Sequence, residues 1–143
     1  MSTQWMDMRI QEEQDHRRQE AKTLELLPQG LEELHRQLAE CLDKYKNAFG
    51  PEAAEISNLV SKLRVTVREP QGGKWQPRDK VDISLVSVPP AFKIQHGEAE
   101  PFLIEIGLLP GDRLSFRFDD KYLTPEDLAR KILDRALFPK LAE

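Results

Sequence analysis

Apolar residues recur at alternating steps of three and four between positions 24 and 45. This spacing predicts a helix with one apolar stripe, in a heptad a/d pattern sustained for about three heptads. The stripe either packs onto the protein's own sheet or forms a coiled-coil seam with another copy. Its members are Leu24, Leu27, Leu31, Leu34, Leu38, Cys41 and Tyr45.

Pro28 falls inside this stripe. A proline in a helix interior removes one backbone donor and collides with the preceding turn, which costs about 3 kcal/mol. The sequence therefore predicts one broken helix or two helices, and we favour two, over residues 4–26 and 29–49. Cys41 is expected to be a small buried apolar side chain in this stripe rather than a nucleophile, because nothing around it lowers a thiol pKa.

The first of these helices is polar on every side over residues 11–20. Such a helix is solvated or is ordered by a partner. Its start differs, because Trp5, Met6 and Ile10 are apolar and lie close together. The segment is therefore either a solvated extension or a docking and dimerising arm that these three residues anchor.

The pattern changes to a period of two after Gly50 and Pro51, which is typical of half-buried strands. Leu59, Ser61, Leu63, Val65 and Val67 form the inner face of the first predicted strand. Short connections between the strands favour an antiparallel meander. Residues 51–58 are read as a short helix or a lead-in, and residues 70–79 as a long connection around Trp75. The predicted strands cover residues 59–68, 80–88, 92–96, 102–106 and 114–118.

The end of the chain carries the signals of a helix start. Thr124 suits the N-cap, Pro125 the first helical position, and Asp127 is the acid three residues after the cap. Leu123 and Leu128 occupy the two positions of a hydrophobic staple. The apolar face that follows predicts a helix packed on one face of the sheet.

These elements together predict an α+β fold. An N-terminal helical arm over residues 1–50 precedes a five-stranded antiparallel meander with its covering C-terminal helix, over residues 51–143.

The outer face of the predicted sheet is rich in basic residues. Seven of its positions are basic and two are acidic, so the face either is simply solvated, with charges that discourage edge pairing, or meets an acidic partner. Arg64, Arg68, Arg113 and Arg117 are the candidate contacts for a polyanion. No aromatic side chain occupies these positions, so the stacking platform of sheet-type RNA binders is missing. The face comprises Lys62, Arg64, Thr66, Arg68, Lys80, Asp82, Ser84, Lys93, Gln95, Glu105, Arg113, Ser115 and Arg117.

No catalytic, cofactor or metal site is predicted. His96, Glu98 and Glu100 alternate as zinc ligands can, but Gly97 and Ala99 predict a turn that breaks their alignment. The pair at 119–120 is expected to have a structural role at a strand-to-helix corner. The glycine-rich phosphate loops and the nucleophile elbow are absent from the sequence, which favours a protein that is not an enzyme.

The composition of the chain argues against some classes of partner. The 143 residues carry a net charge of −4, which argues against a whole-protein electrostatic attraction to nucleic acid. One cysteine excludes an internal disulfide. The N-terminus does not resemble a signal peptide, and no apolar run approaches the roughly 20 residues of a membrane helix. The sequence therefore predicts a cytoplasmic protein without a membrane partner.

The function predicted first is a non-catalytic protein–protein interaction or assembly module that associates with a protein partner or with itself through the N-terminal helices. The alternative is binding of a polyanion or nucleic acid through the arginine-rich sheet face, although nucleic acid is the less expected partner. The order helix, sheet, helix in a small acidic chain is similar in layout to the small cytosolic chaperones of bacterial secretion. That similarity implies a chaperone-like binder as a second alternative.

Overall fold

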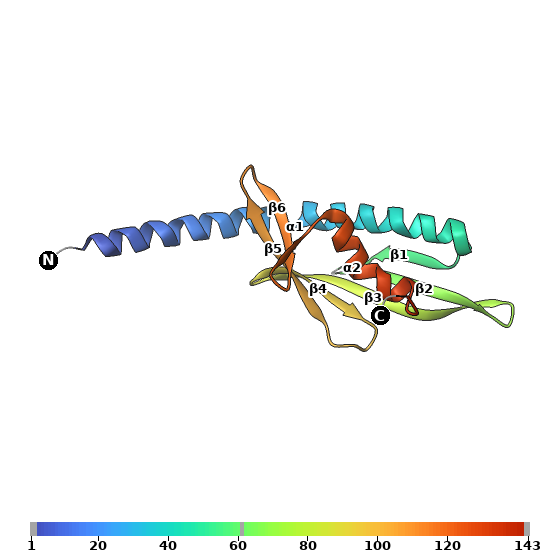
Figure 1. The fold of residues 1–143 in the computed structure, drawn as a ribbon. Coiled ribbons are helices and arrows are strands. Elements are labelled where there is room, and N and C mark those ends of the chain that lie inside the picture. The colour runs from blue at the N-terminus through green and yellow to red at the C-terminus, as the bar shows by residue number, and fades with distance from the viewer. Residues whose placement is uncertain (1–2, 61, 142–143) are drawn as a thin grey trace.

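A computed structural model of the protein describes residues 3–60 and 62–141, and Figure 1 shows its fold. A long N-terminal helix precedes a run of strands, and a short helix follows them. The elements are α1 (Gln4–Phe49), β1 (Ala54–Asn58), β2 (Lys62–Gln71), β3 (Lys74–Ser87), β4 (Pro90–His96), β5 (Phe102–Leu109), β6 (Arg113–Phe118), β7 (Lys121–Leu123) and α2 (Pro125–Leu137).

The strands form one antiparallel sheet in the order β1-β2-β3-β4-β5-β6-β7, so each strand pairs with its neighbours in sequence. The predicted α+β class, the antiparallel sheet and the two flanking helical regions are confirmed. The predicted number of five strands is wrong, because the sheet has seven. The assignment of Leu59 to the inner face is wrong, because Leu59 precedes β2 and is exposed. Ser61, which the alternation also assigned to that face, lies outside the described residues.

The two additional strands lie at the two edges of the sheet. β1 comes from the segment read as a short helix or lead-in, and its residue Ile56 pairs with Val65 of β2. β7 is only three residues long and pairs with β6. Asp119 and Asp120, with φ of 53° and 62°, form the tight turn between β6 and β7. The prediction that they lie at a strand-to-helix corner is therefore wrong.

The predicted long connection around Trp75 is also wrong. β2 continues to Gln71 and β3 begins at Lys74, so a two-residue hairpin turn joins the strands. Gly72 and Gly73 have φ of 58° and 79°, and positive φ at both central residues is what the favoured hairpin turn requires. The glycine pair makes this turn possible, and both strands extend past the predicted ends.

α1 is one helix that continues through Pro28, so the preferred prediction of two helices is wrong. Proline deprives one carbonyl, that of Leu24, of its helical donor. Leu24 and Pro28 are both exposed, so water can bond that carbonyl. Buried contacts before and after the proline hold the helix together, at Thr23, Leu27 and Gly30.

α1 and α2 lie against the same face of the sheet (Figure 1). Leu27, Leu34, Leu38 and Leu42 of α1 are buried in one core with the sheet and α2, so this part of the stripe packs onto the protein's own sheet. The prediction of a buried Cys41 is wrong, because Cys41 is exposed and the neighbouring leucine is buried in its place.

Gly30 allows α1 to approach the sheet closely. A Cβ atom at this position would lie 2.7 Å from Cδ1 of Leu114 on β6. The glycine in the helix interior is therefore explained by packing, although glycine lowers helix propensity.

The predicted start of α2 is confirmed in detail. The amide of Asp127 donates to the Thr124 hydroxyl at 3.1 Å, and the Asp127 carboxylate accepts from the amide of Thr124. This reciprocal pair is a capping box. Pro125 occupies the first turn, where its missing N–H removes no helical hydrogen bond.

The other end of α2 is capped by a residue that the sequence analysis did not single out. Nη2 of Arg78, on β3, donates to the carbonyl oxygens of Ala136 at 2.6 Å and Leu137 at 3.2 Å. The last carbonyls of a helix lack intrahelical donors and carry partial negative charge, so a guanidinium suits this position. Arg78 thereby ties the end of α2 to the middle of the sheet.

Candidate interaction surfaces

The first part of α1 extends beyond the sheet as an arm (Figure 1). We define the arm as residues 4–22, because Thr23 is the first buried residue of the helix. Trp5, Met6 and Ile10, predicted as its anchor, expose 63%, 43% and 47% of their surface. Met8, which the sequence analysis did not include, is 59% exposed. Four neighbouring apolar side chains therefore face solvent at the tip of the arm.

The middle of the arm is held by polar contacts within the helix. Arg9 pairs with Glu12 at 2.8 Å, and Arg17 pairs with Glu13 at 3.0 Å. Pairs at this spacing stabilise an isolated helix by about 0.2–0.5 kcal/mol each. They support the helical conformation where the sheet does not.

The outer sheet face carries cross-strand ion pairs. Arg64 donates to Asp82 through Nε at 2.7 Å and Nη2 at 3.1 Å, and Lys62 donates to the same carboxylate at 3.1 Å. Arg68 pairs with Glu55 of β1 at 2.5 Å. Glu55 belongs to a strand that the sequence did not predict, so the face is less basic than expected.

The β6 side of this face also carries a cross-strand ion pair. Arg117 donates to Glu105 of β5 at 3.0 and 2.5 Å. The side chain of Arg113 is exposed and has no ion pair or hydrogen bond within the part of the chain that the structure describes. Tyr122 of β7 lies opposite Arg117 and is exposed, so β7 adds an aromatic residue to the face.

The predicted site residues do not form one site. Trp5, Met6 and Ile10 lie on the arm, whereas the arginines lie on the sheet. Among the arginines, the pair on β2 is separated from the pair on β6 by the three strands β3, β4 and β5. No single small ligand can therefore contact all the predicted residues.

The Arg64 guanidinium, by its hydrogen bonds, holds the pKa of the Asp82 carboxyl below its ordinary value of 3.8, and Lys62 adds to this effect. Asp82 in turn raises the pKa of Arg64. A carboxyl whose pKa is lowered by folding stabilises the fold above its unfolded-state pKa, and this contribution is lost as the pH falls through the folded-state pKa.

We expect Asp82→Asn to lower the free energy of unfolding by about 1 kcal/mol at neutral pH, as is usual for partly exposed ion pairs. The loss should shrink as the pH falls below 3.8 and should vanish once the pH is below the lowered pKa of the folded protein, where the wild-type carboxyl is also neutral. Urea denaturation at a series of pH values measures both effects. Asp43→Asn, on an exposed part of α1, is the matched control and should change stability little at any pH. A loss in Asp82→Asn that is independent of pH would contradict the assignment.

A groove of about 430 Å³ lies between the last turns of α1 and the outer side of α2. Its lining is mainly apolar. The ring of Tyr45 lies against those of Phe49 and Phe138, with centroids 4.8 and 5.6 Å away. Phe49 and Phe138 are exposed large apolar residues. The groove is therefore a second apolar surface, at the opposite end of α1 from the arm.

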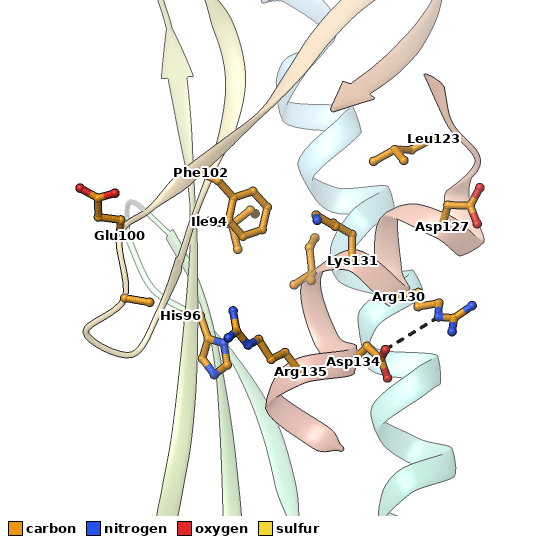
Figure 2. A pocket seen from close by; sticks show the side chains of 12 residues that line it. Ile94, His96, Glu100, Phe102, Leu123, Asp127, Arg130, Lys131, Asp134 and Arg135 are labelled. Atoms are coloured by element: carbon orange, nitrogen blue, oxygen red, sulfur yellow. Dashed lines mark ion pairs between the residues drawn. The ribbon is translucent and has the colours of Figure 1, made fainter. Parts of the chain in front are cut away.

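A cleft of about 480 Å³ lies on the other side of α2, against the β4–β5 hairpin (Figure 2). The described residues include no group of three side chains that could hold a metal ion, so His96, Glu98 and Glu100 do not form the arrangement considered from sequence. Nε2 of His96 instead lies 2.5 Å from the Asp79 carboxylate. Figure 2 shows Glu100 on the far side of the hairpin, directed away from α2.

The fold defines an α+β protein in which two helices cover one face of a seven-stranded antiparallel meander. Comparison with models of known protein families, with curated proteins and with solved structures finds no match for the chain. Within the described residues, neither helix is long and apolar enough to cross a membrane.

Proposed function

We propose that the protein is a non-catalytic interaction module that self-associates through its N-terminal arm. The observation that carries the proposal is the exposed apolar tip of the arm, formed by Trp5, Met6, Met8 and Ile10. Exposed apolar side chains that cluster on an otherwise polar element are typical of a protein contact. The polar remainder of the arm cannot be buried without cost, so the contact is expected at the tip.

The choice of a second copy as the partner rests on the groove between α1 and α2. The same chain carries an exposed apolar tip and an exposed apolar groove, and tyrosine, phenylalanine and tryptophan are enriched at protein interfaces. One copy cannot fill its own groove, because Trp5 and Tyr45 belong to one helix and stand about 60 Å apart at 1.5 Å per residue. A contact between tip and groove therefore requires two chains.

Light scattering over a concentration series tests the self-association. We expect the full chain to exceed its monomer mass of 16.5 kDa as concentration rises. The triple variant Trp5→Gln, Met6→Gln and Ile10→Gln should remain monomeric, because glutamine preserves the helix and removes the apolar tip.

The matched control replaces three exposed apolar residues elsewhere, Val88, Leu103 and Tyr122, by glutamine. It should associate like the wild type. A full chain that is monomeric at about 100 μM would contradict the proposed self-association. A dissociation constant above this concentration corresponds to a binding free energy of less than about 6 kcal/mol. If the control variant were monomeric like the arm variant, the contact between copies would not lie at the tip of the arm.

Binding of a polyanion through the outer sheet face ranks lower. Arg64, Arg68 and Arg117 already pair with carboxylates, so a phosphate must compete with these partners. Only Arg113 of the four candidate arginines is without such a pair in the described part of the chain. A chaperone-like binder and a cytoplasmic location stay predictions from the sequence.

A further inference from the structure

The cleft between α2 and the β4–β5 hairpin combines an apolar floor with cationic side chains. The floor contains Ile94 and Ile132, which are buried, and Phe102, which is partly buried. A volume of about 480 Å³ is within the range of small-molecule sites in proteins. Figure 2 shows Ile94 and Phe102 between the hairpin and the helix.

Two cations of α2 face this floor. Lys131 and Arg135 are four residues apart and therefore lie on the same side of the helix. Nζ of Lys131 lies 4.1 Å from the ring centroid of Phe118 and 5.5 Å from that of Phe102, which fixes the ammonium at the rim of the floor. Figure 2 shows Arg135 extending from α2 toward His96.

These two cations have no carboxylate within ion-pair distance in residues 3–60 and 62–141. The acids that line the cleft have other roles: Asp127 caps α2, and Asp134 lies 3.9 Å from Arg130. Glu100 also lines the cleft, but its carboxylate is directed away from α2 (Figure 2), and His96 is paired with Asp79. The charge available to a ligand inside the cleft is therefore positive.

We propose that this cleft binds a small amphiphilic carboxylate. The carboxylate lies between Lys131 and Arg135, which supply charge-assisted hydrogen bonds, and the apolar part of the ligand lies on Ile94, Phe102 and Ile132. The site is independent of the arm and of self-association, since the cleft is complete within one chain.

Titration of the full chain with phenylpropionate, followed by calorimetry and by amide chemical shifts, tests the proposal. We expect binding, with shift changes at Phe102 and Ile132. Phenylpropanol keeps the ring and lacks the charge, whereas propionate keeps the charge and lacks the ring. Each should bind at least about tenfold more weakly, and phenylpropylamine, with the opposite charge, should bind least.

The variant Lys131→Gln with Arg135→Gln should lose at least about tenfold in affinity for phenylpropionate. Both residues are exposed, so the melting temperature should stay close to that of the wild type. Lys93→Gln is the matched control, because Lys93 is an exposed cation on β4 that does not line the cleft. The control should bind like the wild type.

Three results would overturn the proposal. The first is no detectable binding of phenylpropionate at about 10 mM, which means a binding free energy of less than about 3 kcal/mol. The second is equal binding of the alcohol or the amine, which would leave only an apolar surface. The third is an equal loss of affinity in Lys93→Gln, which would place the anion outside the cleft.

Discussion

Replacement of Phe92 by alanine is expected to lower the free energy of unfolding by about 3–5 kcal/mol, the usual cost of removing a buried phenylalanine. Phe92 is fully buried in the middle of β4. It lies opposite Leu85 on β3 and Ile104 on β5, and its ring stacks on that of Phe116 with centroids 5.7 Å apart. Alanine would leave a cavity where three strands meet, and the loss is a large fraction of the total stability of about 5–15 kcal/mol.

Urea denaturation, monitored by circular dichroism, measures this effect. Phe49→Ala is the matched control because it removes the same atoms from an exposed position at the end of α1. Its exposed ring lies against that of Tyr45, and such ring pairs contribute up to about 1.5 kcal/mol, so its loss should not exceed that value. Similar losses in the two variants would mean that the core does not lie between the sheet and the helices as described.

Replacement of Arg78 by methionine is expected to cost about 1.5–3 kcal/mol, the usual range for hydrogen bonds to charged groups. Methionine keeps most of the apolar contact of the side chain but cannot donate to the carbonyls of Ala136 and Leu137. The last turn of α2 should loosen in particular, because its carbonyls lose both their donors and a compensating charge.

Amide hydrogen exchange separates this local effect from a general loss of stability. Exchange in the last turn of α2, at residues 134–138, should accelerate more than exchange in β3 and β4. Arg113→Met, on an exposed strand position, should leave stability within about 0.5 kcal/mol of the wild type. An Arg78→Met variant with wild-type stability would show that the guanidinium contributes no net stabilisation. In that case the two hydrogen bonds would be offset by the cost of burying Nε of Arg78, which has no hydrogen-bond partner in the described residues.

Local signals in the sequence predicted α2 and the meander well. The capping residues Thr124 and Asp127 act within one turn, so their effect does not depend on distant contacts. The alternation of apolar residues likewise identified the inner faces of β2 to β6, because a strand with one buried face must alternate.

The errors arose where tertiary contacts decide the structure. Pro28 predicts a break by itself, but buried contacts on both sides of it keep α1 continuous. β1 and β7 are short edge strands whose conformation comes from pairing with β2 and β6. The Gly72-Gly73 pair was a readable hairpin signal, and reading it would have shortened the loop around Trp75.

The interaction surfaces were predictable only in part. Trp5, Met6 and Ile10 could be selected from sequence because apolar residues beside a polar run are conspicuous. The pairing of Arg64 with Asp82 depends on the register of β2 against β3, which the pattern does not contain. The cleft beside α2 likewise needs the position of the β4–β5 hairpin against the helix, which sequence spacing does not give.

The order of elements along the chain has a consequence for synthesis on the ribosome. α1 is translated first, but the surfaces that cover its leucine face come from the sheet and from α2, which begins at Pro125. At about 5–20 residues per second, the intervening strands take on the order of ten seconds to emerge. From β2 on, each new strand finds its pairing neighbour already made, whereas Leu27, Leu34, Leu38 and Leu42 are fully covered only after α2 has emerged. The nascent protein thus exposes part of this apolar helix face until α2 emerges, and that face is what a ribosome-associated chaperone would encounter.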